Sequence, residues 1–344
     1  MNFKKYFPIL EWLPHYNSEF FRGDLIAGLT VGVMLIPQGM AYAMLAGMPP
    51  IYGLYGGLIP LLFYAILGTS RQMSIGPVAI SALLVLAGVS QIADPMTPEY
   101  ISLVILTGLL VGIAQFLLGV FRLGFLVNFI SHPVIVGFTS AAAIIIAISQ
   151  LKDLLGISIP RFSRVYETVH YVSNHFSETN WVTVFLCIGS IIIMLILKKI
   201  NKAIPGALLV VIVGTLLVYF IGEEKLGIDL VKDVPQGLPV FQMPEKIWGK
   251  IQILYPTIFT VTIICIVESI AIAKVLQAKH GDYQIRANQE LIALGISKIG
   301  GAFFQSIPTS GSFTRSAVNN ESGARSGFAS IFTATLIGLT LVFL

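Results

Sequence analysis

Two ionisable residues stand inside long apolar stretches of the chain. Glu268 lies in the middle of the apolar run from Ile251 to Ala273, and Arg315 lies in a segment rich in Ser, Thr and Gly between two apolar runs. Where such runs cross a bilayer, a charged side chain is costly and is by default a candidate functional residue. Arg315 offers a permanent positive charge and a planar fork of donors that suits oxyanions, whereas an intramembrane carboxylate such as Glu268 can take up a proton. The pair therefore indicates a site for a small anion whose binding is linked to protons.

Each residue also has a purely structural interpretation. The long side chain of Arg315 can extend to lipid headgroups at the cytoplasmic surface, and Glu268 can form a structural salt bridge with Lys274 or Arg315. The hydroxyl residues Ser312 and Thr314 beside Arg315 favour a wet, polar site over the headgroup interpretation. For Glu268, a salt bridge and a proton-coupling role do not exclude each other.

Two polar segments, residues 70–81 and 305–316, interrupt the apolar pattern. The first leads through Gly76 into Pro77, and proline is favoured at the first position of a helix. The order of the spans makes one helix start in each segment, the two running in from opposite sides, so that both N-termini meet near the middle of the bilayer. Helix N-termini carry free N–H groups and a partial positive charge, and broken helices at the midplane commonly form transport sites. The sequence thus predicts two opposed half-helices around an anion.

The first apolar span supplies two further candidates. Gln38 and Tyr42 follow Pro37 and stand four positions apart, hence on one face of a helix. They can line the anion site, or Pro37 can simply kink a packed helix. Glycine pairs with the small-xxx-small spacing predict close helix packing rather than ligand contact: Gly28/Gly32 and Gly53/Gly57.

Composition decides which elements position these residues. Apolar residues make up 56% of the 344 positions, charged residues make up only 11%, and the mean hydropathy is +0.86. Long runs contain no Lys, Arg, Asp or Glu at all, and their lengths are close to the roughly 20 residues that a membrane-spanning helix needs, or to a multiple of it. Because lipid cannot satisfy backbone N–H and C=O groups, these runs must be helices. The composition excludes a soluble domain and predicts an all-α polytopic membrane protein.

The spans can be placed and oriented from the charges between them. Residues 1–21 lack the apolar core of a cleavable signal and predict a short amphipathic lead-in. With this N-terminus in the cytoplasm, the inner loops hold the surplus of Lys and Arg, as the positive-inside rule requires. The chain stops on apolar residues without a basic anchor, which predicts a truncated chain whose later spans are absent. We expect spans near 25–46, 51–68, 75–91, 100–121, 124–151, 181–198, 204–221, 251–273 and 289–304, then a half-helix from Ser312 and a last span from Gly327.

The sequence contains no motif for metal binding, nucleotide binding or nucleophilic catalysis. The five histidines and two cysteines show no metal-ligand or disulfide spacing, and there is no P-loop and no nucleophile motif. We therefore expect no enzyme activity, no cofactor and no metal site. Membrane topology explains the net charge of +4 better than nucleic-acid binding does, so no nucleic-acid partner is expected.

Several motifs resemble the signature of the SulP family, the sulfate permeases. The similarity runs from about Phe7 to the last residue, and the combination of motifs is specific. The motifs that carry it are Gly28-Leu29-Thr30-Val31-Gly32, Ile36-Pro37-Gln38-Gly39-Met40-Ala41-Tyr42-Ala43, Pro49-Pro50-Ile51-Tyr52-Gly53, Gly68-Thr69-Ser70-Arg71, Ser74-Ile75-Gly76-Pro77, Glu268-Ser269-Ile270-Ala271, Asn288-Gln289-Glu290-Leu291 and Gly311-Ser312-Phe313-Thr314-Arg315-Ser316.

This resemblance implies a fold and a domain order. Members have fourteen membrane segments in two inverted seven-segment repeats, the uracil-permease-like arrangement of a core and a gate domain, usually followed by a cytoplasmic STAS domain. On this pattern the chain ends near the eleventh segment, before the last gate helices and the STAS domain. The implied division is a lead-in at 1–24, core at 25–123, gate at 124–250 and core again at 251–344.

The resemblance also implies the site and the activity. Glu268 matches the acid of the proton-coupled members, and Val78 stands where some relatives have an aromatic residue, which leaves the choice of anion open. The implied substrate-binding residues are Gln38, Tyr42, Val78, Ala79, Ser312, Phe313, Thr314 and Arg315.

We expect a secondary active transporter of inorganic anions, with proton-coupled sulfate uptake by alternating access as the leading function. The alternatives are a bicarbonate or dicarboxylate transporter, an uncoupled anion channel or exchanger, and a nontransporting voltage-sensing protein; sodium coupling also stays open. The expected partners are a sulfate-like anion, protons and membrane lipid, with a homodimer allowed. The expected location is the plasma membrane, in a bacterium the inner membrane, as a multi-pass protein.

Overall fold

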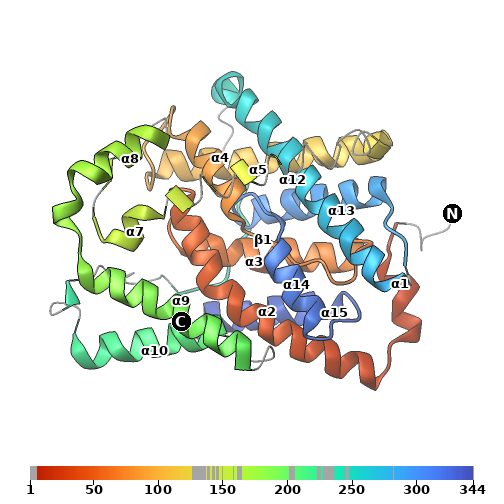
Figure 1. Cartoon of the computed structure of the whole chain (residues 1–344). Coiled ribbons are helices and arrows are strands. Elements are labelled where there is room, and N and C mark those ends of the chain that lie inside the picture. The colour runs from red at the N-terminus through yellow and green to blue at the C-terminus, as the bar shows by residue number, and fades with distance from the viewer. Residues whose placement is uncertain are drawn as a thin grey trace. The chain divides into compact units, whose positions relative to one another are not determined.

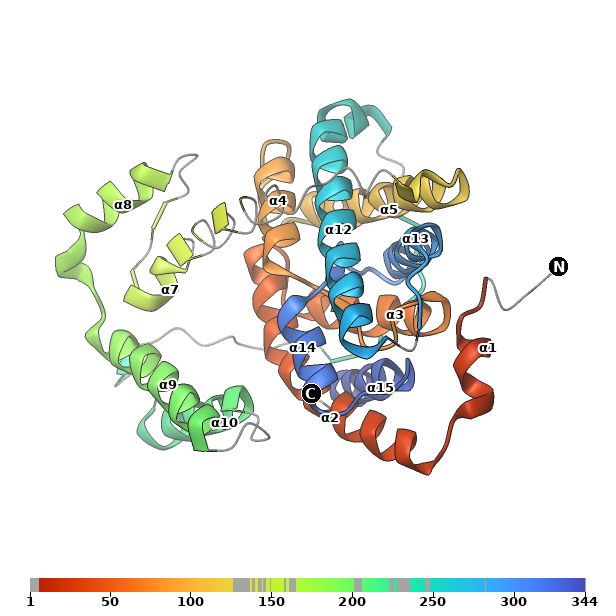
Figure 2. The same ribbon diagram turned by 45° about the vertical axis from the view of Figure 1, so that its right-hand side comes forward.

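The structure, a computed structural model, divides into two compact units (Figure 1; Figure 2). One unit comprises Met1–Ser131 and Val234–Leu344, and the other comprises His132–Asp233. The residues described are 6–125, isolated positions between 137 and 148, 150–157, 159–160, 165–200, 206–222, 226–227, 236–244, 248–281 and 283–343. The predicted span at 124–151 falls mostly outside them.

The first unit is a bundle of helices with one small pair of strands. Its elements, in chain order, are α1 (Ile9–Trp12), α2 (Ser18–Leu45), α3 (Ile51–Leu67), β1 (Ile75–Gly76), α4 (Ala79–Val89), α5 (Pro98–Val120), α12 (Ile251–His280), α13 (Ala287–Phe303), β2 (Ser310–Gly311), α14 (Phe313–Glu321) and α15 (Phe328–Phe343).

Hydropathy and length identify the membrane helices. Three helices among the described residues are long and apolar enough to cross a bilayer, namely α2, α5 and α12, and shorter apolar helices include α3, α4 and α15. The helix α2 begins earlier than predicted, because the Asn17 side chain caps it by accepting from the Phe20 amide at 2.9 Å. The chain is thus a multi-pass helical membrane protein, as its composition predicts.

Glycines let these helices pack backbone against backbone. A Cβ placed on Gly53 would lie 1.9 Å from the Gly39 carbonyl oxygen, and one on Gly28 would lie 2.6 Å from the Ala329 carbonyl oxygen. Neither position can accept a larger side chain without moving a helix. The predicted small-residue packing is therefore confirmed, and it brings α2 against both α3 and α15.

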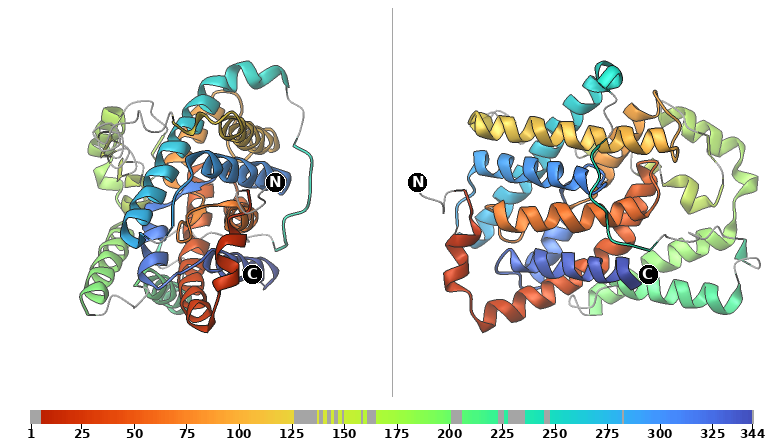
Figure 3. Two further views of the ribbon diagram at one scale, coloured as in Figure 1. Left: turned by 90° about the vertical axis from the view of Figure 1, so that its right-hand side faces the viewer. Right: turned by 180° about the vertical axis from the view of Figure 1, so that it is seen from behind.

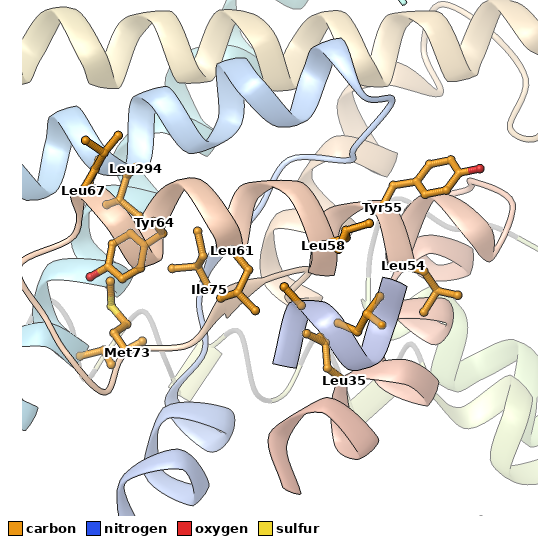
Figure 4. Packing of buried hydrophobic residues seen from close by; sticks show 14 of the residues in the cluster. Leu35, Leu54, Tyr55, Leu58, Leu61, Tyr64, Leu67, Met73, Ile75 and Leu294 are labelled. Atoms are coloured by element: carbon orange, nitrogen blue, oxygen red, sulfur yellow. The ribbon is translucent and has the colours of Figure 1, made fainter. Parts of the chain in front are cut away.

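The helix α3 lies at the centre of the largest apolar cluster. Figure 3 shows α5, α13 and α3 stacked side by side. Figure 4 shows the apolar side chains that fill the space around α3, among them Leu54, Leu58, Leu61 and Tyr64 of that helix with Leu35, Met73, Ile75 and Leu294 from its neighbours. This core fixes the segment that follows α3, where the helical pattern breaks.

The break consists of two short strands that pair antiparallel. Ile75 pairs with Gly311 and Gly76 pairs with Ser310, and the Ser312 amide extends the ladder by donating to the Ser74 carbonyl at 3.0 Å. Residues before proline avoid helical dihedrals, and Gly76, the last residue of β1, precedes Pro77, whereas β2 begins two residues after Pro308. The backbone groups that leave the helical pattern satisfy each other in this pairing. Among the described residues these four are the only ones in strands, and they are the exception to the predicted all-helical fold.

The second unit contains α7 (Leu151–Leu155), α8 (Val165–Asn174), α9 (Trp181–Ile200) and α10 (Gly206–Ile221). Leu155, Ile157 and Val184 form its buried cluster. Large apolar side chains stay exposed on its helices, for example Phe185 at 70% and Phe220 at 80%. Apolar outer surfaces of this kind suit helices whose surroundings are lipid rather than water. The roles of core for 25–123 and 251–344 and of gate for 124–250 stay predictions.

Candidate functional site

Two helices begin directly after the strand pair. The helix α4 starts at Ala79 with Val78 as its N-cap, and α14 starts at Phe313 with Ser312 as its N-cap. Neither helix runs through Gly76 or Ser312, so the predicted breaks are confirmed, but Pro77 lies before the N-cap of α4 and not in its first position as predicted. The hydroxyl of Ser312 accepts weakly from the Arg315 amide at 3.4 Å, whereas the valine side chain at the start of α4 cannot accept a hydrogen bond. Free N–H groups and two positive dipole ends therefore remain beside the strands.

Arg315, in the first turn of α14, is the largest fully buried side chain of the described residues. Its Nη1 donates to Gln38 Oε1 at 3.4 Å, a long hydrogen bond, and its Nε and Nη2 are buried without a hydrogen-bond partner among the described residues. A side chain with 0% exposure does not reach headgroups, so the surface interpretation of Arg315 does not fit. The unused donors of this buried guanidinium are available to an acceptor outside the described residues.

The glycine of β1 makes room for this guanidinium. A Cβ on Gly76 would lie 3.2 Å from Arg315 Nη2, and the φ angle of Gly76 is +157°, a conformation that other residues rarely adopt. The backbone of β1 can approach the guanidinium closely only because this residue has no side chain.

The predicted face of α2 does reach this region. Gln38 contacts the guanidinium directly, and Tyr42 interacts with it electrostatically. The hydroxyls of Ser312 and Thr314 lie 3.2 Å apart at the start of α14. The side chains of Phe313 and Thr314 are exposed, Val78 is buried and Ala79 is half-buried in the first turn of α4. The structure thus brings Gln38, Tyr42, Ser312 and Arg315 together and leaves the side chains of Phe313 and Thr314 exposed beside them.

Glu268 lies on α12, beside β2. The Glu268 carboxylate forms a hydrogen bond with the side chain of Ser310. The Oε2 atom of Glu268 is buried without a hydrogen-bond partner in the described part of the chain. The adjacent Ser269 accepts from the Gly311 amide at 3.0 Å, which fixes α12 to the strand. Within the described residues no ion pair joins Glu268 to Arg315, although the two charges interact at longer range. The predicted acid is therefore next to the break and incompletely satisfied.

Besides Arg315, three charged side chains are buried among the described residues, Asp24, Glu290 and Lys298, and the sequence pattern singled out none of them. Glu290 is fully buried and accepts from the Tyr64 hydroxyl at 2.7 Å and from the Thr69 and Ser70 amides at 2.5 and 3.1 Å. Lys298 is buried in the middle of α13. A lone lysine within an apolar span is a signal for a functional residue, and it could have been used at position 298. Among the described residues no three His, Cys, Asp or Glu side chains gather as metal ligands.

Comparison with known proteins assigns the chain to a family. The sequence model of the sulfate permease family matches residues 21–344. This chain belongs to the sulfate permease family. It is 42% identical over 347 residues to the probable sulfate transporter 4.2 of Arabidopsis thaliana, covering 98% of this chain and 51% of the relative. It is 38% identical over 349 residues to the high affinity sulfate transporter 2 of Stylosanthes hamata, covering 98% of this chain and 53% of the relative.

The chain thus spans about half the length of the curated sulfate permease relatives that it matches. Among solved structures it resembles SLC26A9 with a TM-score of 0.92 and 28% identity, over 99% of this chain and 57% of that chain. It also resembles the transmembrane domain of the cyanobacterial bicarbonate transporter BicA, with a TM-score of 0.83 at 21% identity over 95% of this chain and 84% of that chain, which shows a shared fold alone. The uracil-permease-like inverted-repeat fold expected for the family is therefore confirmed.

Proposed function

We propose that this chain forms the anion-binding part of a secondary active transporter that takes up sulfate together with protons. The observation that carries the proposal is Arg315, a fully buried cation whose Nε and Nη2 have no hydrogen-bond partner among the described residues. Leaving such donors unsatisfied is costly, so the site is built for a ligand that supplies acceptor oxygens. A tetrahedral oxyanion offers several acceptors to a planar fork of donors.

The helix starts support the same ligand. The first-turn N–H groups of α4 and α14, at Ala79 and Phe313, are the backbone donors that helix N-termini offer to anions. The proposed binding set comprises these backbones together with the side chains of Gln38, Tyr42, Ser312, Thr314 and Arg315, with Val78 lining the site. The relatives from Arabidopsis thaliana and Stylosanthes hamata are named sulfate transporters, which favours sulfate as the anion.

Glu268 is the proposed proton carrier. Its Oε2 is buried without a partner in the described part of the chain, and its charge interacts with that of Arg315. Protonation removes the negative charge that would otherwise compete with sulfate for the guanidinium. Proton binding and anion binding then favour each other, because each lowers the electrostatic cost of the other.

In the proposed alternating-access cycle, the core residues carry the anion between the two sides by moving against the gate residues. Core residues 25–123 and 251–344 hold the strand pair and both half-helices, so the anion would move with them as one body. We further propose a location in the plasma membrane with a cytoplasmic N-terminus and a homodimeric assembly. The inner surplus of Lys and Arg supports that orientation.

Uptake by proteoliposomes containing the full-length transporter tests the proposal. We expect radiolabelled sulfate to accumulate when the lumen is more alkaline than the medium, and unlabelled sulfate to compete better than bicarbonate, oxalate or chloride. Large currents without proton movement would instead support a channel. Absence of sulfate uptake under a proton gradient would contradict the proposal.

A further inference from the structure

Lys298 is a buried cation outside the site described so far. Lys298 is only 3% exposed. A Cβ added to Gly112 of α5 would lie 2.9 Å from the Cβ of Lys298, so the two helices are in close contact here. The ammonium donates to Gln115 Oε1 at 2.8 Å, and Gln115 Nε2 in turn donates to the Thr262 carbonyl oxygen at 3.4 Å. Helices α5, α12 and α13 therefore enclose this ammonium, and a buried ammonium needs a compensating negative charge.

The negative charge nearest to Lys298 is shared with the proposed anion site. From α12, the groups that interact electrostatically with the ammonium are Cys265 and Glu268, and from α5 the facing polar group is the neutral Gln115. Glu268 in turn interacts with both Arg315 and Lys298. One acid therefore lies within the fields of two buried cations.

The balance of these charges depends on the proton at Glu268. With Glu268 ionised, the three side chains carry one net positive charge; with Glu268 protonated, they carry two. A dianion then neutralises the protonated cluster. Without Lys298, the protonated cluster would carry one positive charge, which a monoanion neutralises and a dianion exceeds. Net charge is costly in a low-dielectric interior. Lys298 therefore determines whether a dianion or a monoanion binds more favourably when Glu268 carries one proton.

We propose that Lys298 is the residue that makes this site specific for divalent anions, by supplying the second positive charge that a dianion and one proton require. This inference rests on the proposed function, in which Arg315 binds the anion and Glu268 takes the proton. Lys298 acts through the field it adds to that site, so it is a specificity-determining residue rather than a ligand of the anion.

The test compares binding of sulfate with binding of nitrate, a monovalent oxyanion, by the purified full chain at one pH. In Lys298→Gln, we expect the Kd for sulfate to rise about tenfold and the Kd for nitrate to rise only about threefold, because a lost charge acts in proportion to the ligand's charge. Lys298→Arg should restore sulfate binding to within about threefold of the parent. Lys279→Gln, which removes an exposed cation from α12, is the matched control and should leave both Kd values unchanged.

A second variant covers the case in which Lys298→Gln does not fold. Gln115→Glu leaves the lysine in place but sets a negative charge against its ammonium, and it should weaken sulfate selectively in the same way. If either folded variant weakens sulfate and nitrate equally, or weakens neither, Lys298 does not determine valence. If the parent protein binds no sulfate, or Arg315→Ala binds it as well as the parent, the proposed function itself fails.

Discussion

The hydroxyl of Ser269 accepts a hydrogen bond from the Gly311 amide at 3.0 Å and lies 3.3 Å from the Ser310 hydroxyl. Ser269 follows Glu268 on α12, and Gly311 precedes the cap of α14, so this contact joins the proposed proton site to the proposed anion site. We therefore expect a shift of α12 at Glu268 to move the strand that precedes Arg315.

Removing the Ser269 hydroxyl should weaken this link. In Ser269→Ala the buried Gly311 amide loses its acceptor, at a cost of about 1–2 kcal/mol, and the dependence of sulfate uptake on the proton gradient should fall. Ser297→Ala is the matched control, because the Ser297 hydroxyl only donates to Ala293 within its own helix. Thermal unfolding and gradient-driven uptake measure the two effects. If Ser269→Ala and Ser297→Ala change gradient-driven uptake to the same extent, Ser269 does not link the proton site to the anion site.

A side chain at Gly76 should disturb the guanidinium. In Gly76→Ala the new Cβ would lie 3.2 Å from Arg315 Nη2 on a backbone that alanine rarely adopts, so we expect the Kd for sulfate to rise about tenfold. In Gly338→Ala, the control, the nearest side-chain atom is 3.7 Å away, and sulfate binding should stay unchanged. Equilibrium binding to the purified variants measures this, and equal affinities would contradict a close approach of β1 to the site.

Neutralising Glu268 should separate accumulation from exchange. Glu268→Gln cannot change its charge with pH, so sulfate accumulation driven by a proton gradient should be lost while sulfate–sulfate exchange continues. Uptake with and without an imposed gradient, in the same proteoliposomes, measures both. Gradient-driven uptake at the parent's level would remove the proton role from Glu268.

Neutralising Glu290, a second buried acid, should lower stability but leave proton coupling intact, the opposite of the effect expected at Glu268. It accepts from the Tyr64 hydroxyl and from the amides of Thr69 and Ser70, which lead into β1. Glu290→Gln replaces one acceptor oxygen by a donor, so we expect a loss of about 1–3 kcal/mol in stability. The gradient dependence of uptake per folded molecule should persist, because the proposed proton carrier is Glu268. A parallel loss of coupling would show that both acids carry protons.

The sequence predicts much of this arrangement because the signals are local. Proline at position 77, with glycine before it, marks a helix start, and the small-residue pairs on α2 and α3 mark close packing. Position 315 stands out because a charge within an apolar stretch is costly whatever the fold. These features depend on residues a few positions apart, which hydropathy and turn chemistry describe well.

The remaining features depend on partners that are distant in the sequence. The acceptor of Lys298 is 183 positions away, and the amide that Glu290 binds at Thr69 is 221 positions away. Hydropathy places Glu290 at the inner end of a span and cannot show that the structure buries it completely. The strand pair escapes prediction for the same reason, since its register requires positions 75 and 311 to be neighbours.

Sulfate binding by Arg315→Ala tests the central claim most directly. We expect the Kd for sulfate, measured at equilibrium on the purified full chain, to rise about 30-fold or more, because the anion loses its charged donors. Arg325→Ala, which removes an exposed arginine after α14, should bind sulfate as the parent does. An unchanged Kd in folded Arg315→Ala would contradict the claim that this buried guanidinium holds the anion.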